Sequence, residues 1–182
     1  MEPARAWALL EGADCVVDAA AAAAAVARVS AEITSRLGQL QPLVLVVMGG
    51  GVVFAGQLLP QLRFPLDFDY VHATRYGSAT TGGALTWHVK PRAPVAGRTV
   101  LVLDDILDQG YTLAAIRQWL LDQGAAEVLC AVFCHKATGQ PKPLLADFVG
   151  VSVPDRFVFG FGMDVDGAWR NLPAVYALRG TP

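Results

Sequence analysis

The hydrophobic positions of the chain fall into two alternating patterns. Continuous apolar runs at Leu43–Val47, residues 99–103 and residues 128–134 are typical of strands buried on both faces. Between these runs, residues 18–37 and 113–121 are predicted to form helices, the first because an aspartate begins it and a glycine follows it. Buried strands that alternate with helices predict an α/β fold with a mainly parallel sheet flanked by helices.

Shorter or interrupted patterns predict the remaining elements. A helix is predicted over residues 52–62 despite Pro60, and residues 76–83, which are small, polar and rich in glycine, are typical of a mobile loop. Further strands are predicted at residues 66–74, 85–89, 148–151 and 157–159. Because no internal repeat or long linker divides the sequence, residues 1–182 are expected to form a single domain.

One segment, residues 100–112 with the sequence VLVLDDILDQGYT, carries most of the chemical information. Its apolar strand ends in Asp104 and Asp105, and a short loop with Asp108 and Gly110 leads into a helix. A helix N-terminus offers unpaired N–H groups and partial positive charge to a phosphate. The two acids can accept hydrogen bonds from sugar hydroxyls or hold Mg²⁺. The segment is therefore predicted to hold a phosphorylated sugar.

Two other segments with candidate site residues also follow apolar strands. Three glycines at residues 49–51 come after the first strand, and Lys136 comes after residues 128–134. Ligands of open α/β sheets bind beyond the carboxyl ends of the strands, which is where these segments lie.

The composition excludes several classes of protein. The net charge of −2 shows no basic bias, which argues against a general nucleic-acid binder. The apolar tracts are too short or too interrupted to span a bilayer. The alanine run at residues 19–25 follows Glu11, Asp14 and Asp18, where a secretory leader would be cationic. A soluble cytoplasmic protein with no membrane partner is expected, and its 54% hydrophobic content is ample for a packed core.

The three cysteines, Cys15, Cys130 and Cys134, are too few and too scattered for a disulfide framework. Cys130 and Cys134 stand close to His135, which raises the idea of a metal site. The surrounding residues alternate like a strand, however, and unpaired cysteine is common in protein cores. A structural role for both cysteines is preferred.

Several motifs in a fixed order resemble a known family. They are the glycine loop, the YGS sequence at residues 76–78, the segment at residues 100–112, Lys136, and VPDRFVFGFGMD at residues 153–164 followed by Arg170. Together they resemble the type I phosphoribosyltransferases, and within these the hypoxanthine-guanine branch. The resemblance extends over about residues 42–178, most of the chain.

The resemblance implies a fold and a reaction. A twisted, mainly parallel sheet would form a core at about residues 38–150, and residues 1–37 and 151–182 would form a small hood. The reaction would join hypoxanthine or guanine to the phosphoribosyl group of phosphoribosyl pyrophosphate (PRPP), with Mg²⁺ as cofactor. The products would be IMP or GMP and pyrophosphate, and the enzyme would be a homodimer or homotetramer.

The resemblance also assigns the PRPP side of the site. Asp104 and Asp105 would contact the ribose hydroxyls, support Mg²⁺ and face the positive charge that develops on the ribose ring. The 5′-phosphate would be cradled by Asp108, Gln109, Gly110, Tyr111 and Thr112. Asp108 would be the catalytic base that takes the proton from purine N7. From the residues alone, an aspartate that caps the helix is an equal alternative.

The purine would be bound by Lys136, Phe157, Val158 and Asp164. The Lys136 ammonium, which has only donors, would pair with a 6-oxo group and reject the 6-amino group of adenine. Phe157 would stack on the purine ring, and the backbone of Val158 would contact the edge of the ring. Asp164 would hold a second Mg²⁺. Each of three residues also has an ordinary structural alternative. Lys136 could be a solvated lysine at a strand end, Phe157 a core aromatic residue and Asp164 an acid in a turn.

Pyrophosphate would be bound by Gly49, Gly50, Arg75, Tyr76 and Arg170. A guanidinium suits paired phosphate oxygens, although Arg170 alone could be a surface arginine. Gly50 replaces the usual basic residue in a loop that is expected to contain a non-proline cis peptide bond. Arg75 stands before Tyr76 where a serine is usual, and is expected to compensate for the missing basic residue at Gly50.

Two further departures from the family pattern fall inside the phosphate loop. Gln109 replaces a threonine, and Tyr111 replaces a small or basic residue. Because backbone N–H groups do most of the phosphate binding, the loop is expected to tolerate both.

Two alternatives to a hypoxanthine-guanine enzyme stay open. One is a regulator that senses PRPP or nucleotides, which the mildly acidic charge and the presence of Asp108 and Lys136 disfavour. The other is an enzyme that prefers xanthine, because discrimination at the purine 2-position depends on backbone groups near Val158 and Met163.

Overall fold

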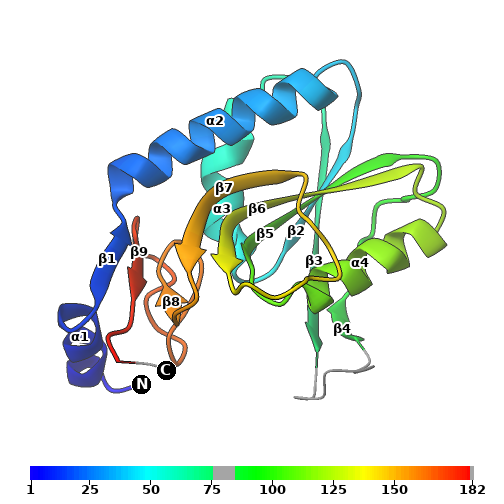
Figure 1. The fold of residues 1–182 in the computed structure, drawn as a ribbon. Coiled ribbons are helices and arrows are strands. Elements are labelled where there is room, and N and C mark those ends of the chain that lie inside the picture. The colour runs from blue at the N-terminus through cyan, green and yellow to red at the C-terminus, as the bar shows by residue number, and fades with distance from the viewer. Residues whose placement is uncertain (76–84, 181–182) are drawn as a thin grey trace.

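A six-stranded sheet forms the centre of the molecule (Figure 1). The computed structural model describes residues 1–75 and 85–180. In sheet order, the strands are β4 (Leu85–Val89), β3 (Asp67–Arg75), β2 (Leu43–Val47), β5 (Thr99–Leu107), β6 (Glu127–Ala137) and β7 (Phe148–Pro154). Neighbouring strands run parallel except β4, which is antiparallel to β3. The predicted α/β fold with a mainly parallel sheet is confirmed.

Helices cover both faces of this sheet. The buried side chains of α2 (Ala19–Leu37) and α3 (Gly51–Leu58) share a core with one face, and those of α4 (Tyr111–Asp122) share a second core with the other. The predicted start of α2 is confirmed, because Asp18 Oδ1 accepts a hydrogen bond from the Ala21 N–H at 2.8 Å. No helix within the described ranges is long and apolar enough to cross a membrane.

The α-helix predicted over residues 52–62 ends earlier than expected. It stops at Leu58, and Leu59–Gln61 continues as a single 3₁₀ turn that contains Pro60. Proline has no N–H to donate to the preceding turn of an α-helix, which explains the change.

Strand β5 continues past the acidic pair, and the predicted strand end at residue 103 is wrong. Asp104 pairs with Val132 and Leu107 with His135 in the parallel ladder between β5 and β6. Leu107 is buried, so this extension has both hydrogen bonds and apolar contacts to stabilise it. The two acids therefore lie inside the strand rather than at its end, and strand pairing fixes their positions.

A second sheet joins the two ends of the described chain. Its strands are β1 (Asp14–Val17), β9 (Val175–Ala177) and β8 (Val158–Phe159), with β9 antiparallel to both neighbours. Figure 1 shows helix α1 (Pro3–Glu11) beside β1. Sequence patterns did not predict α1, β1 or β9.

Helix α2 contacts β7 of the large sheet, so α2 lies with the large sheet although residues 1–37 were assigned to the hood. The core-and-hood division stays a prediction.

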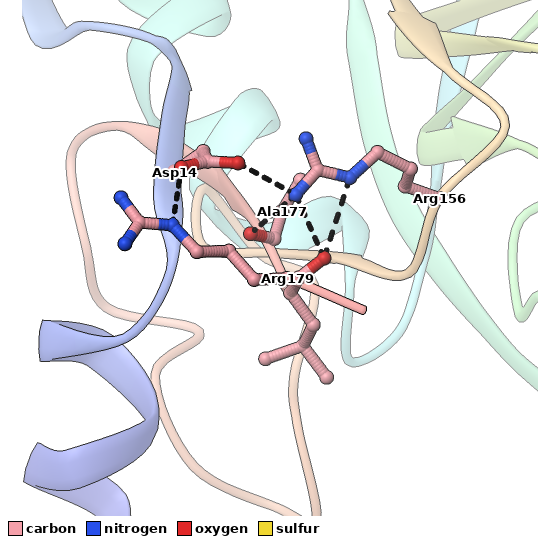
Figure 2. A network of polar contacts seen from close by, with 5 residues as sticks. Asp14, Arg156, Ala177 and Arg179 are labelled. Atoms are coloured by element: carbon pink, nitrogen blue, oxygen red, sulfur yellow. Dashed lines mark hydrogen bonds and ion pairs between the residues drawn. The ribbon is translucent and has the colours of Figure 1, made fainter. Parts of the chain in front are cut away.

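An ion-pair network fixes the small sheet (Figure 2). Asp14 Oδ1 accepts from Arg179 Nε at 2.6 Å, and Asp14 Oδ2 accepts from Arg156 Nη2 at 2.8 Å. Arg156 Nη2 also donates to the carbonyl oxygens of Leu178 at 2.8 Å and Ala177 at 3.4 Å. Hydrogen bonds from Arg179 and then Arg156 lower the pKa of the Asp14 carboxyl, since both cations favour its charged form.

We predict that Asp14→Asn lowers the thermal stability of the protein at pH 7 but not in acid. A carboxyl with a lowered pKa in the folded state contributes stability above its unfolded pKa of about 3.9, and this contribution is lost as the pH falls through the folded value. Thermal unfolding should therefore separate wild type from Asp14→Asn at pH 7, and the separation should shrink below about pH 4. Asp122→Asn is the control, because Asp122 is exposed and bonds the neutral amide of Gln118. A separation of the same size at both pH values would contradict the prediction.

Candidate active site

The site residues predicted from sequence converge at the carboxyl ends of three strands. Residues 48–51 follow β2, residues 108–110 follow β5, and Lys136 lies near the end of β6. Because these strands are parallel neighbours in the sheet, their carboxyl ends meet at one edge. The topology therefore brings the glycine loop, the acidic segment and the lysine together.

The loop between β5 and α4 forms an open cavity of about 380 Å³. It is lined by Asp104, Ile106, Leu107, Asp108, Gln109, Gly110, Tyr111, Thr112 and Leu113. Gly110 is the N-cap of α4, and its left-handed backbone (φ +82°) allows the strand to turn directly into the helix. The N-cap makes no side-chain hydrogen bond. The N-terminus of α4, which carries a partial positive charge, therefore lines this cavity.

Asp104 and Asp105 have carboxyl groups close enough to interact with each other, and each also contacts a different part of the site. Asp104 lines the cavity, whereas the carboxylate of Asp105 lies against the glycine loop. Burial raises the pKa of both carboxyls, and the charge of Asp105 raises that of Asp104 further. The nearby guanidinium of Arg170 offsets part of the rise for Asp105.

This pair of carboxylates is chemically suited to Mg²⁺. Two buried negative charges are costly next to each other, and a divalent cation offsets both. Within residues 1–75 and 85–180, no three His, Cys, Asp or Glu side chains gather closely enough to hold a metal ion by themselves. Mg²⁺ usually combines one or two carboxylates with waters and substrate phosphates, so a pair is sufficient when a phosphorylated substrate is bound.

The glycine loop is shaped around Asp105. The peptide bond between Met48 and Gly49 is cis, as the family pattern led us to expect. A Cβ atom on Gly50 would lie 1.8 Å from Asp105 Oδ2, and a Cβ on Gly162 would lie 2.1 Å from the carbonyl oxygen of Gly50. Both distances are far below van der Waals contact. A side chain at position 50 would therefore have to displace the Asp105 carboxylate from its observed position.

Asp108 and Lys136 are joined directly. Lys136 Nζ donates to Asp108 Oδ2 at 2.7 Å, and the Lys136 side chain is only 12% exposed. Lys136 is therefore not a solvated strand-end lysine. Asp108 accepts a hydrogen bond from Lys136, whereas the N-cap of α4 is Gly110. Asp108 is therefore not the residue that caps the helix. A base candidate and a donor candidate thus stand side by side at one end of the site.

Lys142 was not identified from the sequence, and it connects the end of β5 to β6 beside this pair. Its Nζ donates to the carbonyl oxygens of Leu107 at 2.9 Å and Lys136 at 2.6 Å. Burial is the first cause of a lowered pKa for Lys142. It also lines a second cavity of about 590 Å³ with Asp108 and Lys136. A lysine between two prolines gives no pattern that would identify this role.

The C-terminal segment contributes the remaining described candidates. Phe157 is 44% exposed and so has a ring face that can contact a ligand, whereas Val158 is buried in β8. Asp164 Oδ1 forms an ion pair with Arg170 Nη2 at 2.5 Å, and Asp164 Oδ2 accepts a hydrogen bond from the Gly167 N–H at 2.7 Å. Asp164 therefore stabilises a turn and pairs with Arg170, and its role as a magnesium ligand stays a prediction.

The predicted contact of Arg75 and Tyr76 with pyrophosphate also stays a prediction. Arg75 is the last residue of β3, and Tyr76 lies outside the described residues.

Comparison with known proteins agrees with this geometry. Residues 12–166 match the family model described as the phosphoribosyl transferase domain. Hypoxanthine-guanine phosphoribosyltransferase of Bacillus subtilis is 31% identical over 155 residues, which is 85% of this chain and 86% of that protein. Hypoxanthine-guanine-xanthine phosphoribosyltransferase of Tritrichomonas foetus is 30% identical over 151 residues, 82% of each chain.

A solved structure gives the same result for the fold. The crystal structure of a hypoxanthine-guanine phosphoribosyltransferase from Bacillus anthracis superimposes with a TM-score of 0.85 at 25% identity, covering 91% of this chain and 98% of that one. The fold and the site define a phosphoribosyltransferase. The chain belongs to the phosphoribosyl transferase domain family, and the relatives it matches are hypoxanthine-guanine enzymes of that family.

We predict opposite effects of alanine at two glycines near or on α3. Gly50→Ala should destabilise the protein by about 1–3 kcal/mol, because the new methyl group must displace the Asp105 carboxylate. Gly56→Ala is the matched control: no atom lies within 4 Å of its Cβ position, so alanine should stabilise the helix by about 0.5–1 kcal/mol. Chemical denaturation measures both values, and equal stabilities of the two variants would disprove the proposed fit between Gly50 and Asp105.

Proposed function

We propose that this protein is a purine salvage enzyme that transfers the phosphoribosyl group of PRPP to hypoxanthine, guanine or both, releasing pyrophosphate. The observation that carries this proposal is the contact between Lys136 and Asp108 at 2.7 Å, at the edge of the phosphate cavity. The names of the related enzymes from Bacillus subtilis and Tritrichomonas foetus support it.

The Lys136–Asp108 pair matches one edge of a 6-oxopurine. On that edge, N7–H is a hydrogen-bond donor and the neighbouring O6 is an acceptor. A carboxylate accepts and an ammonium donates, so Asp108 would meet N7–H while Lys136 meets O6. Adenine has an amino group in place of O6 and would leave two donors facing each other, which is costly in a part-buried site. The resting contact between Lys136 and Asp108 would be exchanged for these two contacts when the purine binds.

PRPP would occupy the other half of the site. The start of α4 would bind the 5′-phosphate through its N–H groups, and Asp104 and Asp105 would accept hydrogen bonds from the ribose hydroxyls. Arg170 and the backbone of the glycine loop would bind pyrophosphate. Mg²⁺ held by the acidic pair would neutralise charge on the phosphate oxygens.

The proposed reaction needs one bond to form and one to break. Purine N9 would attack the anomeric carbon of the ribose as the bond from that carbon to the pyrophosphate oxygen breaks. Asp108 would accept the N7 proton, and the carboxylates near the ribose would stabilise the positive charge that develops on its ring. A homodimer or homotetramer is our further proposal for the assembly, and light scattering of the purified protein measures it directly.

Nucleotide formation from each base tests the proposal. Purified protein with PRPP and Mg²⁺ should convert hypoxanthine, guanine or both, and should leave adenine largely unused. Xanthine is the informative additional base, because the Tritrichomonas foetus relative is named for it as well. Absence of product with every base would refute the enzymatic function and favour a PRPP-sensing protein. Fast use of adenine would refute the role given to Lys136.

We predict that Asp108→Asn lowers kcat about 10²–10⁴-fold, the usual contribution of a general base, with a much smaller change in the KM for PRPP. The asparagine keeps the size of the side chain but cannot accept the proton. Initial rates at varied PRPP and saturating purine measure both constants. Loss of PRPP affinity with an unchanged kcat would assign Asp108 to the phosphate loop alone. Asp122→Asn, at the far end of the helix that follows Asp108, is the control and should leave both constants unchanged.

A further inference from the structure

The N-terminal helix α1 contacts the turn that leads to Arg170. Trp169 Nε1 donates to the carbonyl oxygen of Ala6 at 2.8 Å. The rings of Trp7 and Trp169 meet edge to face, with centroids 4.8 Å apart and an interplanar angle of 69°. Arg5 and Asp166 add an exposed ion pair at 3.5 Å, which contributes little by itself. The hydrogen bond and the aromatic contact connect α1 to the residue immediately before Arg170.

Trp169 needs such support because its backbone is unusual. Its φ angle is +71°, in the left-handed region that bulky side chains rarely adopt. A residue in this region persists only where its surroundings hold it there. The carbonyl oxygen of Ala6 accepts a hydrogen bond from the indole N–H of Trp169, and the ring of Trp7 meets that indole edge to face. The left-handed turn at Trp169 sets the direction in which the chain leaves toward Arg170.

Arg170 is held from the other side by the site itself. Its Nη1 donates to the carbonyl oxygen of Gly162 at 2.7 Å, and its own carbonyl oxygen accepts from the Gly162 N–H at 2.9 Å. Gly162 in turn lies against the carbonyl of Gly50 in the glycine loop. The charge of Arg170 acts on Asp105. Arg170 thus stands between the glycine loop and a turn whose geometry depends on α1.

We propose that α1 is a positioning element for the pyrophosphate half of the site, and that Trp7 and Trp169 are its positioning residues. This inference rests on the proposed function, because it assumes that Arg170 binds pyrophosphate. Neither tryptophan lines either of the two cavities at the site. Their effect is to hold the left-handed turn, so that the Arg170 guanidinium points at the glycine loop before PRPP arrives.

The variants Trp169→Phe and Trp7→Ala test this role when their KM values for PRPP, pyrophosphate and purine are compared. Phenylalanine at position 169 keeps the ring but removes the N–H that bonds Ala6. Each variant should raise the KM for PRPP in the forward reaction, and the KM for pyrophosphate in the reverse reaction, about three- to tenfold, the range expected for one hydrogen bond or aromatic contact. The KM for the purine should change less than about twofold. Trp7→Phe, which retains an aromatic edge, should restore values close to wild type.

Trp119→Phe is the matched control. Trp119 forms the other tryptophan pair of the described chain, with Trp87, at a centroid distance of 4.7 Å, and lies on α4 away from Arg170. It should lower the melting temperature to a similar degree while leaving the KM for PRPP and pyrophosphate unchanged.

Two results would overturn the positioning role. One is an unchanged KM for both PRPP and pyrophosphate in Trp169→Phe. The other is an equal rise in the KM for PRPP, pyrophosphate and purine, which indicates general loosening of the fold. An inactive wild type would instead refute the proposed function, so the two failures are distinguishable. Calorimetric titration of the variants with pyrophosphate and Mg²⁺ provides a readout without turnover, and it should show the same loss of affinity.

Discussion

The placement of two carboxylates side by side in β5 constrains the rest of the site. Burial disfavours the charge on Asp104 and Asp105, so the surrounding chain must provide cations, hydrogen bonds or close backbone contact. Parallel pairing with β6 holds the strand beyond the pair. The glycines at positions 50 and 162 let the loops approach Asp105 closely. A larger residue at either glycine would force these elements apart.

The fold follows from sequence where local pattern and tertiary packing agree. The apolar run Leu43–Val47 was predicted with its observed bounds because it is buried on both faces and pairs with strands on both sides. The end of β5 was misplaced, because acidic side chains suggest a loop while the ladder with β6 continues past them. The short strands β1 and β9 pair with each other across most of the chain, so no local pattern identifies them.

Part of the candidate site could likewise be predicted from the sequence, and part of it could not. Asp108 and Lys136 could be singled out because each follows an apolar strand of a parallel sheet, which is where ligands bind. Their contact with each other could not be predicted, since it depends on the register between β5 and β6. Lys142 and Trp169 were out of reach for another reason. Their roles depend on contacts to backbone carbonyl groups, and a carbonyl is present at every residue.

The contact between Lys136 and Asp108 also satisfies both charged groups before the proposed purine binds. A part-buried ammonium without an acceptor would be costly, and the carboxylate provides one. Since the two groups already lie at hydrogen-bond distance, a purine that bonds both needs little rearrangement of the strands. The cost of binding is then the exchange of one ion pair for two hydrogen bonds.

The pairing of Asp14 in β1 with Ala177 in β9 determines the order in which parts of the molecule can form during synthesis. Strand β5, its loop, α4 and β6 are neighbours in sequence, so the phosphate cavity depends on contacts of short range along the chain. The small sheet, and with it the turn before Arg170, has to wait until the C-terminal residues have left the ribosome. A nascent chain can therefore fold the loop between β5 and α4 well before the turn that carries Arg170.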